Sequence, residues 1–167
     1  LNIKRVWVEV TSGNGGYGTL AEFDLMVKKD SFETVKFADY AANEEKNALY
    51  EIPRDQISAE FAGDNWAANI PQNMFDGSEQ TFWQTEGIAA MGWPVVLTID
   101  LKSIYKLKEV RMLPRQSADC HGTWLKVTVS GSTDNENWFI IKEGLEFNKD
   151  ILMKTITFDE ETNVRYL

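Results

Sequence analysis

The chain has 167 residues, a formal net charge of −9 at pH 7 and a pI near 4.7. Nucleic-acid binding uses clustered Lys and Arg to displace phosphate counterions, and the sequence contains no basic run, so nucleic acid is excluded as a partner. The single cysteine, Cys120, excludes an intramolecular disulfide, and no apolar run reaches the roughly 20 residues that a membrane-spanning helix needs.

Short apolar runs alternate with polar turns along most of the chain, a pattern typical of an all-β protein. A first strand is predicted over residues 6–10, followed by a glycine-rich loop at 11–18 and a second strand over 20–27. Residues 29–51 are charged and weakly periodic, and we expect a linker there, with a short helix allowed over 39–50. The remaining strands are predicted at 95–101, 107–113, 123–130, 137–142, 153–158 and 163–167. Two packed antiparallel sheets, a β-sandwich, account for this set of strands.

Five motifs follow one another in the second part of the chain. The first is NMFDGSEQTFW at 73–83, and the others are Trp93-Pro94 before the apolar strand at 97–101, Pro114-Arg115-Gln116, the turn at 130–137 before Trp138, and Arg165-Tyr166. Together they resemble the discoidin family, which includes the type C domains of coagulation factors five and eight and the family-thirty-two carbohydrate-binding modules. The resemblance covers residues 52–167 and implies a jelly-roll β-sandwich of the galactose-binding-like class.

The first 28 residues resemble the end of that family rather than its beginning. Family members continue past the Arg-Tyr strand into a strand, a glycine-rich loop and a closing strand with Ala-Glu, and residues 7–25, with Ala21-Glu22, are similar to this ending. Either the domain is circularly permuted, so that 1–28 supply its closing strands and 52–167 its body, or 1–28 are the tail of a preceding repeat. We favour permutation, because a sandwich without its closing strands would expose long unpaired edges.

The resemblance also implies a structural calcium ion. The family site joins an Asp-Gly loop to the Ala-Glu of the closing strand, and calcium prefers six to eight hard oxygen ligands. Carried over by position, the ligands are the Asn73 carbonyl, the Asp76 carboxylate, the Thr81 oxygens, the Ala21 carbonyl and the Glu22 carboxylate, with Ser78 where the family often has Asn or Asp. The plainer alternative is that the aspartate of the Asp-Gly pair only caps its own turn.

Sugar recognition needs an aromatic face and a few oriented polar groups. In this fold the ligand surface lies on loops at one end of the sandwich, and by position the candidates are Arg115, Tyr17, Trp66 and Gln84, with His121 and Asn14 in second place. An arginine that pairs with an acid and an aromatic ring in the core are the plainer alternatives. Galactose-binding members often carry His at the position of Gln84, which weakens a prediction of terminal galactose.

These predictions combine into a non-catalytic carbohydrate-binding module, an accessory domain of a larger exported or cell-surface parent protein, with any export signal removed or outside this sequence. Catalysis is not expected, because His121 has only Cys120 beside it and adjacent residues do not form a hydrogen-bonded pair by default. A protein-adhesion module on the same fold is the alternative. Membrane lipid is disfavoured as a ligand, since a chain of charge −9 is repelled by anionic lipid.

Overall fold

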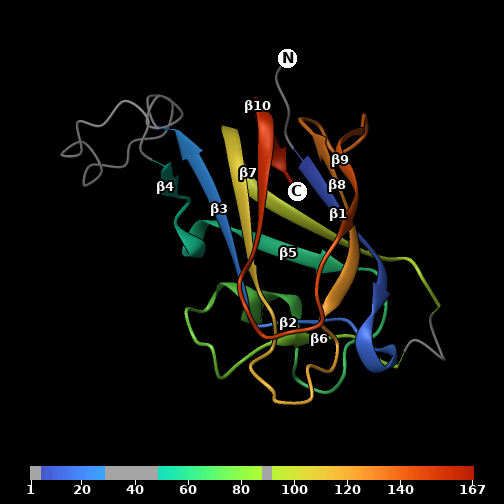
Figure 1. Ribbon diagram of the computed structural model, residues 1–167. Helices are drawn as coiled ribbons and strands as arrows, with labels where there is room; N and C mark the ends of the chain where they lie inside the picture. The colour runs from blue at the N-terminus through green and yellow to red at the C-terminus, as the bar shows by residue number, and fades with distance from the viewer. Residues whose placement is uncertain (1–4, 29–48, 88–91) are drawn as a thin grey trace.

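The computed structural model describes residues 5–28, 49–87 and 92–167. Its regular structure in these ranges is β-strand apart from short 3-10 turns, so the predicted all-β class is confirmed (Figure 1). The strands are β1 (Arg5–Gly13), β2 (Thr19–Leu20), β3 (Glu22–Lys28), β4 (Leu49–Glu51), β5 (Ser58–Phe61), β6 (Trp83–Gln84), β7 (Val95–Leu113), β8 (Trp124–Ser132), β9 (Phe139–Glu146) and β10 (Lys154–Tyr166). The 3-10 turns are η1 (Asn14–Gly16), η4 (Arg54–Gln56) and η5 (Pro71–Phe75).

The long strand β7 links the two layers of the sandwich. Its first half pairs with β1 and β5, and β1 in turn pairs with β8, which pairs with β9. Its second half pairs with β3 and β10, and β3 pairs with β4. The hydrogen-bonded ladder therefore runs from one layer to the other through a single strand.

The passage of β7 between the layers is marked by Lys102. The sequence predicts two strands, at 95–101 and 107–113, whereas the structure has one strand with Lys102 at a φ of 61°. Asp100 Oδ1 accepts the backbone N–H of Lys102 at 2.8 Å, which supports the left-handed conformation of that residue. The strands predicted at 153–158 and 163–167 are likewise one strand, β10, with an irregular register between Thr157 and Thr162.

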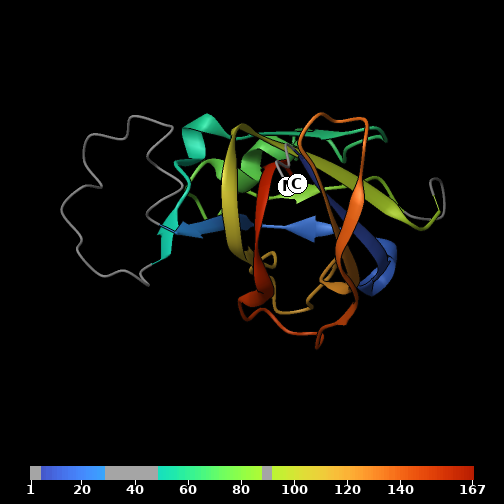
Figure 2. The ribbon, with the colours of Figure 1, turned by 90° about the horizontal axis from the view of Figure 1, so that it is seen from above.

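The N-terminal strands lie inside the main sheet. Val8 pairs with Leu97 of β7 on one side and with Val129 of β8 on the other. Arg5 pairs with Tyr166, so the start of β1 lies beside the end of β10 (Figure 2). Residues 29–48, which contain most of the expected linker and helix, lie outside the described residues, and residues 49–51 form strand β4 rather than the end of a helix.

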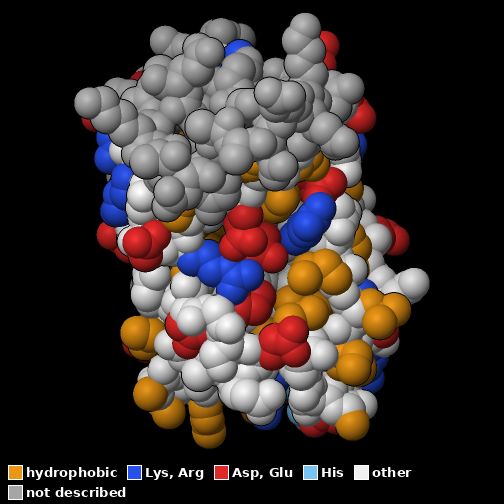
Figure 3. Space-filling model, turned by 90° about the vertical axis from the view of Figure 1, so that its left-hand side faces the viewer, with side chains coloured by type: hydrophobic (Ala, Val, Ile, Leu, Met, Phe, Trp, Pro, Cys, Tyr) orange, Lys and Arg blue, Asp and Glu red, His pale blue; other side chains and the backbone are white. Residues whose placement is uncertain are grey.

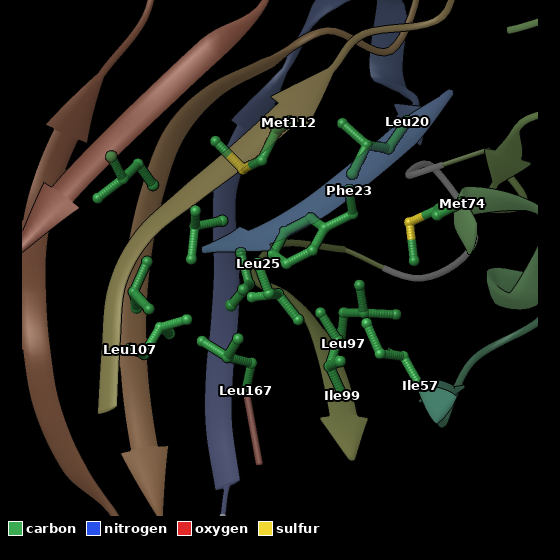
Figure 4. Packing of buried hydrophobic residues seen from close by; sticks show 14 of the residues in the cluster. Leu20, Phe23, Leu25, Ile57, Met74, Leu97, Ile99, Leu107, Met112 and Leu167 are labelled. Atoms are coloured by element: carbon green, nitrogen blue, oxygen red, sulfur yellow. The ribbon is translucent and has the colours of Figure 1, made fainter. Parts of the chain in front are cut away.

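Alternating apolar side chains of the two layers form the core. Val95, Leu97, Ile99 and Leu101 of β7 are buried, with partly buried residues between them. Figure 4 shows side chains from both layers pointing toward one another, among them Leu20, Phe23, Leu25, Ile57, Met74, Leu97, Ile99, Leu107, Met112 and Leu167. Burial of such side chains is the main favourable contribution to folding.

Trp83 packs in the core at the end of the sandwich that carries β2 and β6. Its side chain is fully buried, and its ring meets Phe61 and Trp124 edge-to-face at centroid distances of 5.2 and 6.0 Å. Its indole N–H donates to Asn65 Oδ1 at 2.8 Å, so the one polar atom of the ring is satisfied. The short β2–β6 pair is thereby anchored at the end of the sandwich that faces down in Figure 1.

Among the described residues, no helix is long and apolar enough to cross a membrane.

Candidate functional site

A pocket of about 310 Å³ opens at the end of the sandwich that carries β2 and β6. It lies where the glycine-rich loop, the segment before β6 and the loop between β7 and β8 meet. Its volume falls in the range of small-molecule sites. The lining residues are Tyr17, Thr19, Trp66, Asn69, Phe82, Gln84, Arg115 and His121.

The pocket therefore collects five of the six side chains that the sequence nominates as ligand-binding: Arg115, Tyr17, Trp66, Gln84 and His121. They come from three segments that are far apart in the chain. The described residues of this lining include neither Asp nor Glu, and the ionisable side chains among them are those of Arg115, His121 and Tyr17.

The backbone of Gln84 organises one wall of the pocket. Its N–H donates to the carbonyl of Asn69 at 3.0 Å, and its carbonyl accepts the N–H of Trp66 at 2.9 Å. Thr19 pairs with Gln84 across the β2–β6 ladder. Trp66 leaves 48% of its surface exposed, although neighbouring Trp83 has none, so an open aromatic surface stands at the rim.

Arg115 stacks on an aromatic ring. Its guanidinium carbon is 4.4 Å from the centroid of the Phe82 ring, a cation–π contact. No acidic side chain in the described part of the chain comes within ion-pair distance of Arg115. Stacking fixes the plane of the guanidinium and leaves its N–H groups available to a ligand.

His121 is oriented by its own loop. Its Nδ1 lies 3.2 Å from Asp119 Oδ2, its backbone N–H donates to Asp119 Oδ1 at 3.1 Å, and its ring centroid is 6.3 Å from that of Tyr17. A hydrogen bond from the Ser117 hydroxyl, aided by the backbone N–H of His121, lowers the pKa of Asp119. The carboxylate is therefore available to hold the imidazole at neutral pH. Cys120 is not paired with the imidazole, since its Sγ contacts the carbonyl of Ala118 at 3.9 Å.

Asn14 is not among the lining residues and instead joins two loops. Its side-chain amide donates to the backbone carbonyls of Asp119 and Cys120 at 3.3 and 3.1 Å. Its own backbone carbonyl accepts the N–H of Gly122 at 2.9 Å. Gly122 has a φ of +78°, and a methyl group there would collide with Thr19. Asn14 thus helps to set the pocket wall without facing the pocket.

The predicted metal ligands fall in two groups, one around the Asp-Gly turn and one at the start of β3. In the Asp-Gly turn, Asp76 Oδ1 accepts the N–H of Ser78 at 2.9 Å and Asp76 Oδ2 accepts the hydroxyl of Thr81 at 2.6 Å. The Asn73 amide donates to the carbonyls of Ala68 and Phe82 at 3.2 and 3.1 Å. Asp76 therefore caps its own turn through both of its carboxylate oxygens.

Glu22, the second predicted carboxylate ligand, is the first residue of β3 and is only 4% exposed. Its Oε2 accepts Nη1 of Arg54 at 2.7 Å, whereas its Oε1 is buried without a hydrogen-bond partner. Burial raises the pKa of Glu22 to about 7 against the opposing field of Arg54, with nearby carboxylates including Asp76 raising it further. The turn that contains Asp76 is thus close enough to act on Glu22 electrostatically.

The donor chemistry at this place fits a hard cation in part. Calcium accepts carboxylate, carbonyl and hydroxyl oxygens, and the buried Oε1 of Glu22 is an oxygen that lacks a partner. Within the described ranges, no group of three or more His, Cys, Asp and Glu side chains is placed to hold a metal ion. A calcium ion here would depend on carbonyl and hydroxyl oxygens beside the two carboxylates.

The sequence patterns did not single out three of the lining residues, Phe82, Thr19 and Asn69. Phe82 directly precedes the buried Trp83, and strict alternation along a strand would have placed it away from the core. Thr19 and Asn69 carry no comparable signal. Arg54 was not singled out either, although an arginine beside a proposed acidic site is a candidate counter-ion.

Comparison with known proteins agrees with the fold. The family described as the F5/8 type C domain matches residues 55–167. The structure is similar to that of CpGH89CBM32-5 from Clostridium perfringens in complex with GalNAc-β-1,3-galactose, with a TM-score of 0.61 and 24% identity over 69% of this chain and 83% of the other. It is also similar to the family 32 carbohydrate-binding module of C. perfringens NanJ in complex with galactose, with a TM-score of 0.62 and 23% identity over 69% and 81% of the two chains. Because the family match spans more than half of its length, the chain belongs to the F5/8 type C domain family.

Proposed function

We propose that the chain is a carbohydrate-binding module and that the pocket lined by Tyr17, Trp66, Gln84 and Arg115 holds a sugar residue of a glycan. The observation that carries the proposal is the convergence of open aromatic surface and unpaired polar groups in one pocket. Two structurally similar proteins, both from C. perfringens, were solved with galactose-containing ligands, which supports the ligand class.

Each wall of the pocket has a distinct task in this proposal. Trp66 and Tyr17 offer ring faces to the C–H surface of a sugar. Arg115, held flat on Phe82, donates to ring hydroxyls or to an acidic substituent, and the amide of Gln84 donates and accepts. We propose that the module is non-catalytic, since glycosidases use two carboxylates across the bond and the part of the lining that the structure describes includes no carboxylate.

A glycan array followed by calorimetry tests this function. We expect one glycan class to bind, and we expect Arg115→Gln or Trp66→Ala to weaken its binding at least about tenfold, or ~1.4 kcal/mol. Arg165→Gln removes the same charge at a site on β10 away from the pocket and serves as the control. Capture of a protein partner without heat from any glycan would favour the adhesion alternative.

We further propose a structural calcium ion held by the Asp76 carboxylate, Thr81, the Asn73 and Ala21 carbonyls and Glu22. The unpartnered Oε1 of Glu22 supports it, and the ion would tie the Asp-Gly turn to β3. Ser78 is left out of this ligand set, because it stands where the family often has Asn or Asp. A rise in melting temperature on adding calcium to chelator-treated protein, absent in Asp76→Asn, would support the site.

We also infer that residues 1–28 supply closing strands of the same domain. Supporting this, β1 and β3 pair with β7, although the family match begins only at residue 55. We place the module outside the cytoplasm, as an accessory part of a larger exported protein. Deletion of residues 1–28 is expected to abolish cooperative unfolding, whereas a repeat tail could be removed without loss of the fold.

A further inference from the structure

Arg54 is the hub of an ion-pair cluster on the β3–β4 face. Its guanidinium reaches Glu22 at 2.7 Å, Asp24 at 2.8 Å and Glu51 at 2.7 Å. Figure 3 shows basic and acidic side chains gathered in the middle of this face. All three partner carboxylates are served by one side chain that projects from η4.

The cluster extends to the Asp-Gly turn. A Cβ added to Gly77 would lie 3.6 Å from Nη1 of Arg54, so the guanidinium sits between β3 and that turn. Asp76 is a fourth carboxylate whose charge acts on Glu22. Three carboxylates therefore pair with one fixed positive charge, with Asp76 acting on one of them, and the charge is fixed because an arginine does not lose its proton in proteins.

One oxygen of this cluster is left over. Glu22 is more than nine-tenths buried, and its Oε2 is bonded to Arg54, whereas its Oε1 has no hydrogen-bond partner. A buried carboxylate oxygen without a partner is costly, and a hard cation is one partner that would satisfy it. The Glu22 carboxylate thus binds Arg54 through Oε2, and its Oε1 is available to a second cation.

We propose that Arg54 is an internal counter-cation that competes with calcium for Glu22 and so sets the calcium affinity of the domain. The inference rests on the calcium site proposed above. A guanidinium and a calcium ion sharing one carboxylate repel each other in a partly buried site, where charges are poorly screened. With the ion absent, Arg54 neutralises β3 and holds it to η4, so the fold does not depend on calcium for its integrity.

The opposite arrangement makes the opposite prediction. If Arg54 instead orients Glu22 for the ion, as a supporting residue does for a metal ligand, its removal lowers calcium affinity. Competition requires that removal raise it. The sign of the change therefore decides between the two.

The test is calcium titration by calorimetry on the chelator-treated full chain, with thermal unfolding in calcium and in chelator. We expect Arg54→Gln to bind calcium about tenfold more tightly than the wild type, to melt at lower temperature in chelator, and to gain more from calcium. Arg54→Lys keeps the positive charge but loses the forked guanidinium geometry, and we expect its calcium affinity to lie between those of the wild type and Arg54→Gln. Arg165→Gln, with the same change in net charge, is the matched control and leaves calcium affinity unchanged.

If Arg54→Gln does not fold, the double variant Arg54→Gln/Glu51→Gln replaces it in the test. The second change removes one negative charge at the partly exposed Glu51, so the net charge equals that of the wild type and Glu22 is kept. Unchanged or weaker calcium binding in the folded Arg54 variants would overturn the inference while leaving the calcium site in place. Failure of every variant to bind calcium would remove the calcium site and the inference together. Glycan titration of the same proteins reports separately on the pocket, so neither result is confused with failure of the sugar-binding function.

Discussion

The guanidinium of Arg115 lies 4.4 Å from the centroid of the Phe82 ring, and both side chains line the pocket. Phe82 thereby acts as a platform for the one arginine in the pocket. We predict that Phe82→Ala weakens glycan binding about tenfold, because an unstacked guanidinium must be ordered when the ligand binds. Calorimetry on the glycan selected by the array measures the effect. Phe139→Ala, at an exposed aromatic on β9, is the control and should bind normally.

The two tryptophans at this end of the sandwich should separate binding from stability. Trp66 is 48% exposed, so Trp66→Ala is predicted to remove most glycan affinity while shifting the free energy of unfolding by less than about 1 kcal/mol. Trp83 is fully buried and packs against Phe61 and Trp124, so Trp83→Ala should cost about 3–5 kcal/mol. Urea unfolding of both variants measures this contrast. Equal destabilisation by the two changes would contradict it.

Gly122 packs against Thr19, one of the residues that line the pocket. Its φ of +78° disfavours any side chain, and a methyl group there meets Thr19, whose backbone N–H donates to the Gly122 carbonyl at 2.8 Å. We predict that Gly122→Ala lowers the free energy of unfolding by about 2 kcal/mol and also weakens glycan binding. Gly16→Ala, at a φ of +74° but with open space around the added Cβ, should destabilise less and serves as the comparison.

Asp100 gives the fold a defined response to acid. Burial alone raises the pKa of Asp100, but hydrogen bonds from the Lys102 N–H and from the Arg165 and Lys102 side chains outweigh it and lower the pKa below 3.8. Its charge therefore stabilises the fold above that pH, and the contribution is lost as the pH falls from about 4 through the lowered folded-state pKa. Asp100→Asn should cost about 1–2 kcal/mol at pH 7 and progressively less as the pH falls below 4, as denaturant unfolding across pH can show. Glu60→Gln, at an exposed position on β5, should show no such difference between pH values.

Local patterns predicted the fold well because alternation of apolar residues survives in most of its strands. The strand predicted at 95–101 is the first half of β7, with Leu97 and Ile99 buried as expected. The apolar pattern could not predict that β7 continues through Lys102. The left-handed conformation of this residue is supported by a hydrogen bond to the Asp100 side chain, which alternation of apolar residues does not encode.

The candidate site was predicted mainly through family resemblance. Position in the family nominated Arg115 and Tyr17, which the structure brings into one pocket, but it also nominated Asn14, which instead joins two loops through backbone carbonyls. Arg54 had no place in that reasoning. Its three ion pairs arise from tertiary contacts between η4, β3 and β4, and no local motif encodes them.

The central claim is that a glycan occupies the pocket at the β2–β6 end. The most direct measurement is an NMR titration of the labelled chain with the glycan chosen by the array. The account predicts that the indole N–H signal of Trp66 and the amide signals of Tyr17, Gln84 and His121 shift in a saturable way. Saturable shifts confined to the opposite end of the sandwich, or no shift with any glycan, would contradict it.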